Sequence, residues 1–194
     1  MQITIASQNQ KKLIEIRQKL PSFEVKSLKP TDFPEELLED GETLEENALQ
    51  KVRQVYGVLK EACFADDTGL EIDALAGEPG VYSARYAGEQ RDADDNMDKL
   101  LKELVNKRER TARFETVIAL NINNEQYVFT GKVEGEITQN KSGEKGFGYD
   151  PVFKPFGYTK TFAELPLEVK NKIGHRGKAI QKLILYLESL TPVK

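Results

Sequence analysis

The sequence TLEENALQKVRQVYGVLKEACFADDTG, residues 43–69, contains the clearest signs of a helix followed by a strand. Thr43 is followed three residues later by Glu46, which forms the capping box typical of a helix start. Apolar residues then recur on one helical face at positions 44, 48, 52, 55 and 59, so we predict a helix from about Thr43 to Lys60. Residues 63–65 predict a short buried strand that ends at Asp66-Asp67-Thr-Gly69, because two carboxylates and a glycine are not expected to continue an apolar run.

Outward from this stretch, strand-like and helix-like patterns alternate. Ile3 and Ile5 predict a strand, followed by a polar loop, a helix with apolar residues at 13, 16 and 20, and a second strand over 23–28. A helix is expected around 97–104, and two β-rich runs, 116–122 and 126–137, are joined by the hairpin turn Asn123-Asn124. A glycine-rich loop over 143–149 and a last helix over about 178–190 complete the chain. These patterns predict an α/β or α+β protein with a mixed sheet, forming a single domain over 1–194 with a smaller β-rich lobe at about 112–140.

The charges of the chain nearly cancel, with 28 Lys and Arg against 32 Asp and Glu and a net charge of −4. This balance gives no overall attraction to nucleic acid or to an anionic membrane. No run approaches the ~18 apolar residues of a membrane span, and the N-terminus has no secretion-signal pattern. We therefore expect a cytoplasmic protein that binds neither nucleic acid nor membrane. The single cysteine, Cys63, lies in an apolar run and is expected to be a buried small hydrophobic residue.

Polar residues lie where the first strand gives way to the first helix. Ser7, Asn9 and Lys12 could bring a hydroxyl, an amide, free backbone N–H groups and an ammonium to one phosphate. The alternative is an ordinary helix N-cap followed by solvated lysines.

Carboxylates form a second candidate cluster, at Glu39 and at Asp66-Asp67. Mg²⁺ prefers oxygen ligands and is often held by one or two carboxylates together with substrate phosphates. A solvated acidic loop is the alternative for residues 35–42, but two adjacent aspartates at the end of an apolar strand favour a nearby cation. Lys51, on the predicted helix, could reach into a cleft from the edge of the apolar face or be solvated.

Two later segments carry groups suited to a nucleobase. Glycines on both sides of Phe147 leave its ring open for a flat ligand, although an aromatic turn that fills the core is the alternative. His175, the only histidine, is more often structural when alone. Beside Arg176, it offers N–H donors suited to carbonyl oxygens or phosphate.

Together these segments resemble the family of inosine/xanthosine triphosphate pyrophosphatases, which remove non-standard purine nucleotides. The resemblance covers nearly the whole chain and is carried by Ser7–Lys12, Glu39, Gly41–Thr43, Glu46–Ala48, Lys51, Ala65–Leu70, Pro79–Tyr86, Gly146–Pro151 and His175–Gly177. It implies an elongated α/β fold with a mixed twisted sheet, two lobes and a nucleotide cleft between them, assembled as a homodimer.

The resemblance also implies residue roles. Glu39 and Asp67 would hold Mg²⁺, and Asp67 would activate water, with Lys12 and Lys51 completing the catalytic set. The substrate-binding residues would be Ser7, Gln8, Asn9, Gln10, Lys11, Lys12, Thr68, Phe147, Gly148, Tyr149, Asp150, Lys170, His175 and Arg176. Gln8 stands where the family usually has a small residue, and Gly174 stands where a serine commonly precedes the His-Arg pair. Neither departure removes a charged group, and the Gly174 change bears on substrate preference more than on activity.

The resemblance implies hydrolysis of ITP, dITP and XTP to the monophosphate and pyrophosphate, which cleanses the nucleotide pool. Metal-assisted attack of water on the α-phosphorus needs positioning and cations rather than a covalent nucleophile, and the sequence has no obvious Ser-His or Cys-His pair. A pyrophosphatase for another nucleotide class, such as modified pyrimidines, and a non-catalytic nucleotide-binding module are the alternatives.

Overall fold

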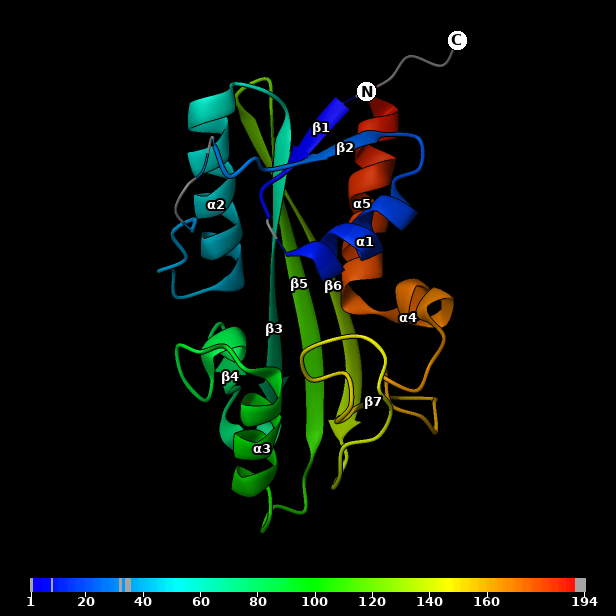
Figure 1. Ribbon diagram of the computed structural model, residues 1–194. Coiled ribbons are helices and arrows are strands. Elements are labelled where there is room, and N and C mark those ends of the chain that lie inside the picture. The colour runs from blue at the N-terminus through cyan, green and yellow to red at the C-terminus, as the bar shows by residue number, and fades with distance from the viewer. Residues whose placement is uncertain (1, 8, 32, 34–35, 191–194) are drawn as a thin grey trace. The chain divides into compact units, whose positions relative to one another are not determined.

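The computed structural model describes residues 2–7, 9–31, 33 and 36–190, with the side chain of Lys11 left out. Helices and strands alternate along the first part of the chain, which continues with three successive strands and then two successive helices (Figure 1). The helices are α1 (Gln10–Lys19), α2 (Leu44–Leu59), α3 (Ala93–Glu103), α4 (Leu167–Ile173) and α5 (His175–Ser189), with short 3₁₀ turns η1 (Asp73–Leu75) and η2 (Ser83–Arg85). The strands are β1 (Gln2–Ile5), β2 (Glu24–Ser27), β3 (Cys63–Ile72), β4 (Pro79–Gly80), β5 (Thr111–Ile122), β6 (Glu125–Ile137) and β7 (Phe153–Pro155).

The strands form one mixed sheet in the order β2-β1-β3-β5-β6-β7, with β4 paired to β3. β1 runs parallel to both β2 and β3, with Gln2 opposite Glu24 and Thr4 opposite Cys63. β4 and β7 pair antiparallel to β3 and β6. The predicted α/β class with a mixed sheet is therefore confirmed.

The helix predicted from the capping box is α2. The Thr43 side chain accepts from the backbone N–H of Glu46, and the Glu46 side chain accepts from the backbone N–H of Thr43. Lys60 ends the helix in the left-handed conformation at φ 54°. The predicted hairpin turn is also confirmed, because Asn123 and Asn124 both have positive φ, at 53° and 66°.

Three sequence predictions about element boundaries are wrong, one of them for the strand predicted over 116–122, which is β5 and begins at Thr111. β3 does not end at Ala65 but continues through Asp66, Asp67 and Gly69 to Ile72, because buried cationic and amide partners described below compensate the two carboxylates. α5 begins at His175 rather than near residue 178. His175 and Arg176 are both buried, at 4% exposure, so they start the helix instead of forming a loop before it.

The chain divides into two compact units, each with its own core. Unit 1 comprises residues 1–67, 116–131 and 176–194, and unit 2 comprises 68–115 and 132–175. In unit 1, apolar residues of α1 and α5 pack with β1, β3 and β5, while the thiol of Cys63 donates to the Val52 carbonyl of α2. Figure 1 shows α2 on one side of these strands and α1 and α5 on the other. Residues 112–140 contribute to both units, and the predicted smaller lobe stays a prediction.

The core of unit 2 gathers apolar residues of α3, β3, β5, β6 and β7, with Phe114, Phe153 and Phe162 as its aromatic centre.

Cys63, in unit 1, is fully buried as predicted, and burial raises the pKa of its thiol to about 12. In the part of the chain that the structure describes, no helix is both long and apolar enough to span a membrane.

Candidate active site

The turn between β1 and α1 presents the first predicted cluster. Asn9 caps α1, because its side-chain oxygen accepts from the backbone N–H of Lys12 at 3.2 Å. The Ser7 hydroxyl accepts from the N–H of Asn9 at 3.2 Å. Asn9 and Gln10 are exposed and Ser7 is half-buried. The helix start therefore faces solvent with a lysine in its first turn, an arrangement suited to an anion.

Asp66 lies beneath this turn as the centre of a buried ion cluster. Its side chain is inaccessible, and each carboxylate oxygen lies 3.2 Å from Lys12 Nζ. Arg176 Nε donates to the same carboxylate at 3.2 Å, and Arg176 Nη1 donates to Glu15 at 2.7 Å. Burial raises the pKa of Asp66, but the charges of Lys12, Arg176 and Lys51 together lower it by more than burial raises it. The pKa of Asp66 therefore lies well below its usual range. Asp66 is therefore ionised and orients the two cations.

Lys51 is the centre of a second cluster, formed by α2, β3 and the loop before α2. Its Nζ lies 2.9 Å from Glu39 Oε1, 3.0 Å from Asp67 Oδ1 and 2.7 Å from the carbonyl oxygen of Asp66. Burial lowers the pKa of Lys51, but Asp67, Glu39 and Asp66 raise it more. Lys51 is therefore a charged ammonium, even though only 3% of the residue is exposed.

Asp67 is held on both carboxylate oxygens. Lys51 contacts Oδ1, and the Asn47 amide donates to Oδ2 at 3.2 Å. Burial raises the pKa of Asp67 and the nearby Glu39 adds to that rise, which outweighs the lowering by Lys51 and Lys12. Asp67 is accordingly a better proton acceptor than an exposed aspartate, and it is fixed in direction.

Glu39 and Asp67 fit the requirements of a magnesium site that is completed by a ligand. The two carboxylates already hold one cation, the Lys51 ammonium, between them. Mg²⁺ commonly uses one or two carboxylates plus substrate phosphates. Among the described residues, no group of three or more His, Cys, Asp or Glu is placed to hold a metal. Water or phosphate oxygens would therefore have to complete the coordination.

In unit 2, the Gly146–Pro151 segment forms a tight loop around Asp150. The Asp150 carboxylate accepts from the backbone N–H of Phe147 at 2.8 Å and from Lys170 Nζ at 2.6 Å. A Cβ on Gly146 would lie 2.0 Å from the same carboxylate, and φ is +78°, so the loop requires glycine there. Lys170 Nζ lies 4.8 Å from the centre of the Phe147 ring. The Phe147 ring is therefore half-buried, with the Lys170 ammonium close to it.

The remaining predicted residues of unit 2 have mixed environments. Tyr149 is 5% exposed and its hydroxyl donates to the Ser83 carbonyl, and the His175 ring stacks on Phe114 at 4.6 Å and 24°. Thr68 and Gly148 are half-buried. A Cβ at Gly174 would lie 2.6 Å from the carbonyl oxygen of Lys170, which is too close, so the backbone after α4 would have to shift to accept a larger residue there.

The structure thus brings the predicted residues together in two groups, one within each unit. Unit 1 holds Ser7, Asn9, Lys12, Glu39, Lys51, Asp67 and Arg176, and unit 2 holds Phe147, Asp150, Lys170 and His175. Gln8 lies outside the described residues, as does the side chain of Lys11. Sequence reasoning gave no role to Asn47 or Glu15, and it grouped Asp66 with Asp67 as a candidate magnesium ligand without identifying Lys12 and Arg176 as its partners, since these contacts join residues distant in sequence.

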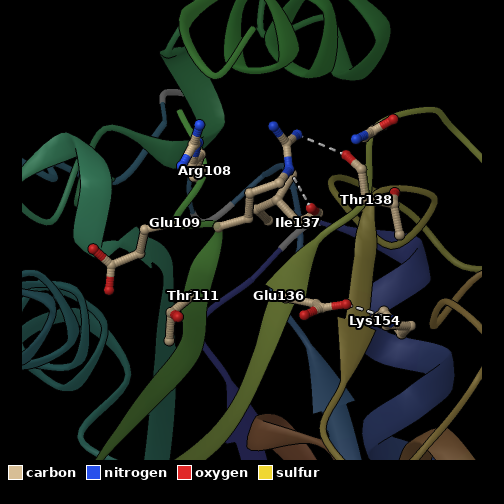
Figure 2. A pocket seen from close by; sticks show the side chains of 9 residues that line it. Arg108, Glu109, Thr111, Glu136, Ile137, Thr138 and Lys154 are labelled. Carbon is tan, nitrogen blue, oxygen red and sulfur yellow. Dashed lines mark hydrogen bonds and ion pairs between the residues drawn. The ribbon is translucent and has the colours of Figure 1, made fainter. Parts of the chain in front are cut away.

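One pocket of about 450 Å³ opens elsewhere in unit 2, where β5 begins and β6 ends. Figure 2 shows Arg108, Thr111, Glu136 and Lys154 around it. Arg110, also in the lining, donates to three backbone carbonyls, and Lys154 pairs with Glu136 at 2.5 Å. None of the predicted site residues that the structure describes lines this pocket, so it is not the candidate active site.

The fold and these clusters define a mixed α/β protein in which two buried aspartates of β3 each hold a lysine. Asp66 pairs with Lys12 at the start of α1, and Asp67 pairs with Lys51 of α2. Residues 3–186 match the Ham1 family, and the chain belongs to that family. A protein of Flavobacterium johnsoniae named dITP/XTP pyrophosphatase is 57% identical over 188 residues, covering 95% of this chain and 96% of the relative. A Bacillus subtilis protein of the same name is 46% identical over 190 residues, covering 95% and 96%. The solved structure of the Staphylococcus aureus Ham1 protein has a TM-score of 0.89 at 42% identity, covering 98% of this chain and 100% of that one.

Proposed function

We propose that this protein hydrolyses non-standard purine nucleoside triphosphates, namely ITP, dITP and XTP, to the monophosphate and pyrophosphate. The observation that carries the proposal is the Lys51 cluster, in which two carboxylates and an ammonium converge beside a second lysine held by Asp66. The names of the relatives, dITP/XTP pyrophosphatase, support the same substrate class.

In this proposal, Glu39 and Asp67 are the residues that would hold Mg²⁺. The metal would supply positive charge that neutralises the phosphates, as cations do in phosphoryl transfer. Lys12 and Lys51 bind the triphosphate with the exposed start of α1 at Asn9 and Gln10 and with the half-buried Ser7, because these groups supply positive charge or hydrogen-bond donors.

Asp67 is the proposed general base. Water attacks the α-phosphorus, its proton passes to the Asp67 carboxylate, and the bond to the bridging oxygen breaks so that pyrophosphate leaves. The raised pKa of Asp67 and its fixing by Asn47 and Lys51 support this role.

The contacts of Lys12 lead to a prediction about the triphosphate grip. Lys12→Ala should weaken ITP binding by roughly 1.5–3 kcal/mol, the range for a charge-assisted contact, and inosine binding far less. Calorimetry in the Asp67→Asn background measures both affinities without turnover. Equal losses for ITP and inosine would mean that Lys12 only supports the fold through Asp66.

We further propose that Phe147, Tyr149, Asp150, Lys170 and His175 form the base-binding region, and that Arg176 contributes selectivity through its N–H donors. The purine 6-position carries a carbonyl acceptor in hypoxanthine and xanthine but an amino donor in adenine. A site built around such a hydrogen bond can reject the wrong partner by ~10⁴-fold. The ion pairs of Arg176 with Glu15 and Asp66 hold its guanidinium in a fixed direction, which suits this role.

The test of Arg176 uses lysine, because Arg176→Ala would leave two buried carboxylates short of a cation. Arg176→Lys retains the charge but loses the planar fork, so kcat/KM should fall steeply for ITP and little for ATP. A shrinking ITP/ATP ratio is the expected result. An equal fall for both nucleotides would show that Arg176 acts on phosphate or structure instead.

A homodimer is proposed on the family resemblance, so light scattering should give about twice the chain mass of 21.9 kDa. The cytoplasmic location expected from the sequence stays a prediction.

A further inference from the structure

The loop that carries Glu39 is fastened along α2 by helix side chains. Gln54 accepts from the backbone N–H of Leu38 at 3.0 Å and donates to its carbonyl at 3.1 Å. Gln50 accepts from the N–H of Asp40 at 3.2 Å and donates to the Asp40 carboxylate at 2.6 Å. The residues immediately before and after Glu39 are thus each held by one glutamine through two hydrogen bonds.

The same helix face also fastens the end of the loop. The Asn47 side chain accepts from the N–H of Gly41 at 2.8 Å, and Glu46 accepts from the N–H of Glu42 at 2.8 Å. Positions 47, 50, 51 and 54 lie on one face of the helix, because residues three and four apart are neighbours there. Gln50 and Gln54, which bind the loop, therefore lie on either side of Lys51 on this helix face. The Lys51 ammonium forms the ion pair with the Glu39 carboxylate.

This arrangement explains how an irregular loop can present a carboxylate in one place. Residues 36–41 form no helix or strand, so no strand partner fixes their backbone. Gln54 binds both polar backbone groups of Leu38 in the way that a neighbouring strand would. The Glu39 side chain itself forms an ion pair with Lys51 at 2.9 Å, and 39% of that side chain is exposed.

We propose that Gln50 and Gln54 are positioning residues for Glu39, which set the affinity of the Glu39–Asp67 pair for a divalent cation. The proposal rests on the proposed function, in which these two carboxylates hold Mg²⁺. Without the glutamines, the loop has to be ordered when the cation binds, and that ordering weakens binding. Neither glutamine touches the substrate or the reacting atoms in this account.

The test replaces both glutamines by methionine, which retains the side-chain length and a similar helix propensity but removes the amide. Mn²⁺ binding to the full-length protein is measured by electron paramagnetic resonance, without nucleotide. Hydrogen exchange at Leu38 and Asp40 reports the loop, and thermal unfolding reports the fold. Gln126→Met is the matched control, because Gln126 accepts two hydrogen bonds from Arg53 of α2 outside this loop.

The expected result for the Gln50→Met/Gln54→Met variant is Mn²⁺ affinity weaker by about tenfold, from the loss of several hydrogen bonds that each contribute modestly. Exchange at Leu38 and Asp40 should be faster, with the midpoint of thermal unfolding close to that of the Gln126→Met control. Each single variant should show a smaller loss in the same direction, which covers the case in which the double variant folds poorly.

Unchanged Mn²⁺ affinity in the folded variants, or an equal loss in the Gln126→Met control, would overturn the positioning role. Failure of the proposed function is seen separately, as absence of pyrophosphate release from ITP by the unaltered protein with Mg²⁺. The Mn²⁺ titration decides the role of the glutamines in either case.

Discussion

Asp67→Asn should lower turnover of ITP by at least about a hundredfold, the low end of the contribution of a general base or of fixed electrostatic stabilisation. The substitution retains the size of the side chain but removes the charge that accepts the proton and binds the cation. The fold should survive, because Lys51 retains Glu39 and the carbonyl of Asp66 as partners. Steady-state pyrophosphate release at saturating Mg²⁺ is the measurement.

A matched control distinguishes this effect from a general loss of negative charge. Asp73 follows the same strand in unit 2 and pairs with Arg113, outside the proposed site. Asp73→Asn should leave turnover at the wild-type level. Near wild-type turnover in a well-folded Asp67→Asn variant would show that the base and metal ligand lie elsewhere.

The second large effect is on stability, at Asp66. Asp66→Asn should reduce the free energy of unfolding by on the order of 3–5 kcal/mol at pH 7, the cost of removing one partner from a buried ion cluster. Lys12 would lose its carboxylate, and Arg176 would lose one of its two carboxylate partners among the ion pairs described here, retaining Glu15. Urea unfolding of both proteins is the measurement.

The pH dependence of this difference is a further check. The folded pKa of Asp66 is lowered, so its contribution to stability is present above the unfolded value of about 3.9 and is lost as the pH falls toward the folded pKa. The gap between wild type and Asp66→Asn should therefore shrink below about pH 4. A gap that stays constant as the pH falls would mean that the aspartate charge is not its source.

The parts of the fold that sequence predicts well are those with local causes. The capping box of Thr43 and Glu46 and the turn at Asn123-Asn124 lie within a few residues of the structures that they create. β3 was predicted to end at Asp66 because its compensating cations, Lys12 and Arg176, lie 54 and 110 residues away in sequence. The early start of α5 was missed for the same reason, namely that its cause lies far away in sequence. Arg176 in the first turn of α5 is buried against Glu15 of α1 and Asp66 of β3.

The candidate site shows a similar limit. Sequence named Glu39, Lys51 and Asp67 separately as candidate site residues, and the structure places the Lys51 ammonium in contact with both carboxylates. It did not reveal that Asp66 and Asp67 differ, with the pKa of one lowered and that of the other raised. The division depends on which face of β3 each aspartate occupies and which cation it meets. Gln50 and Gln54 carried no sequence signal, because glutamines on a helix are ordinary.

The most direct test of the central claim is a panel of nucleoside triphosphates with Mg²⁺ and separate detection of pyrophosphate and phosphate. The account predicts that ITP, dITP and XTP yield the monophosphate and pyrophosphate, while ATP and modified pyrimidine triphosphates are cleaved far more slowly. Preferred cleavage of a modified pyrimidine triphosphate, or tight binding of ITP without release of pyrophosphate, would contradict it.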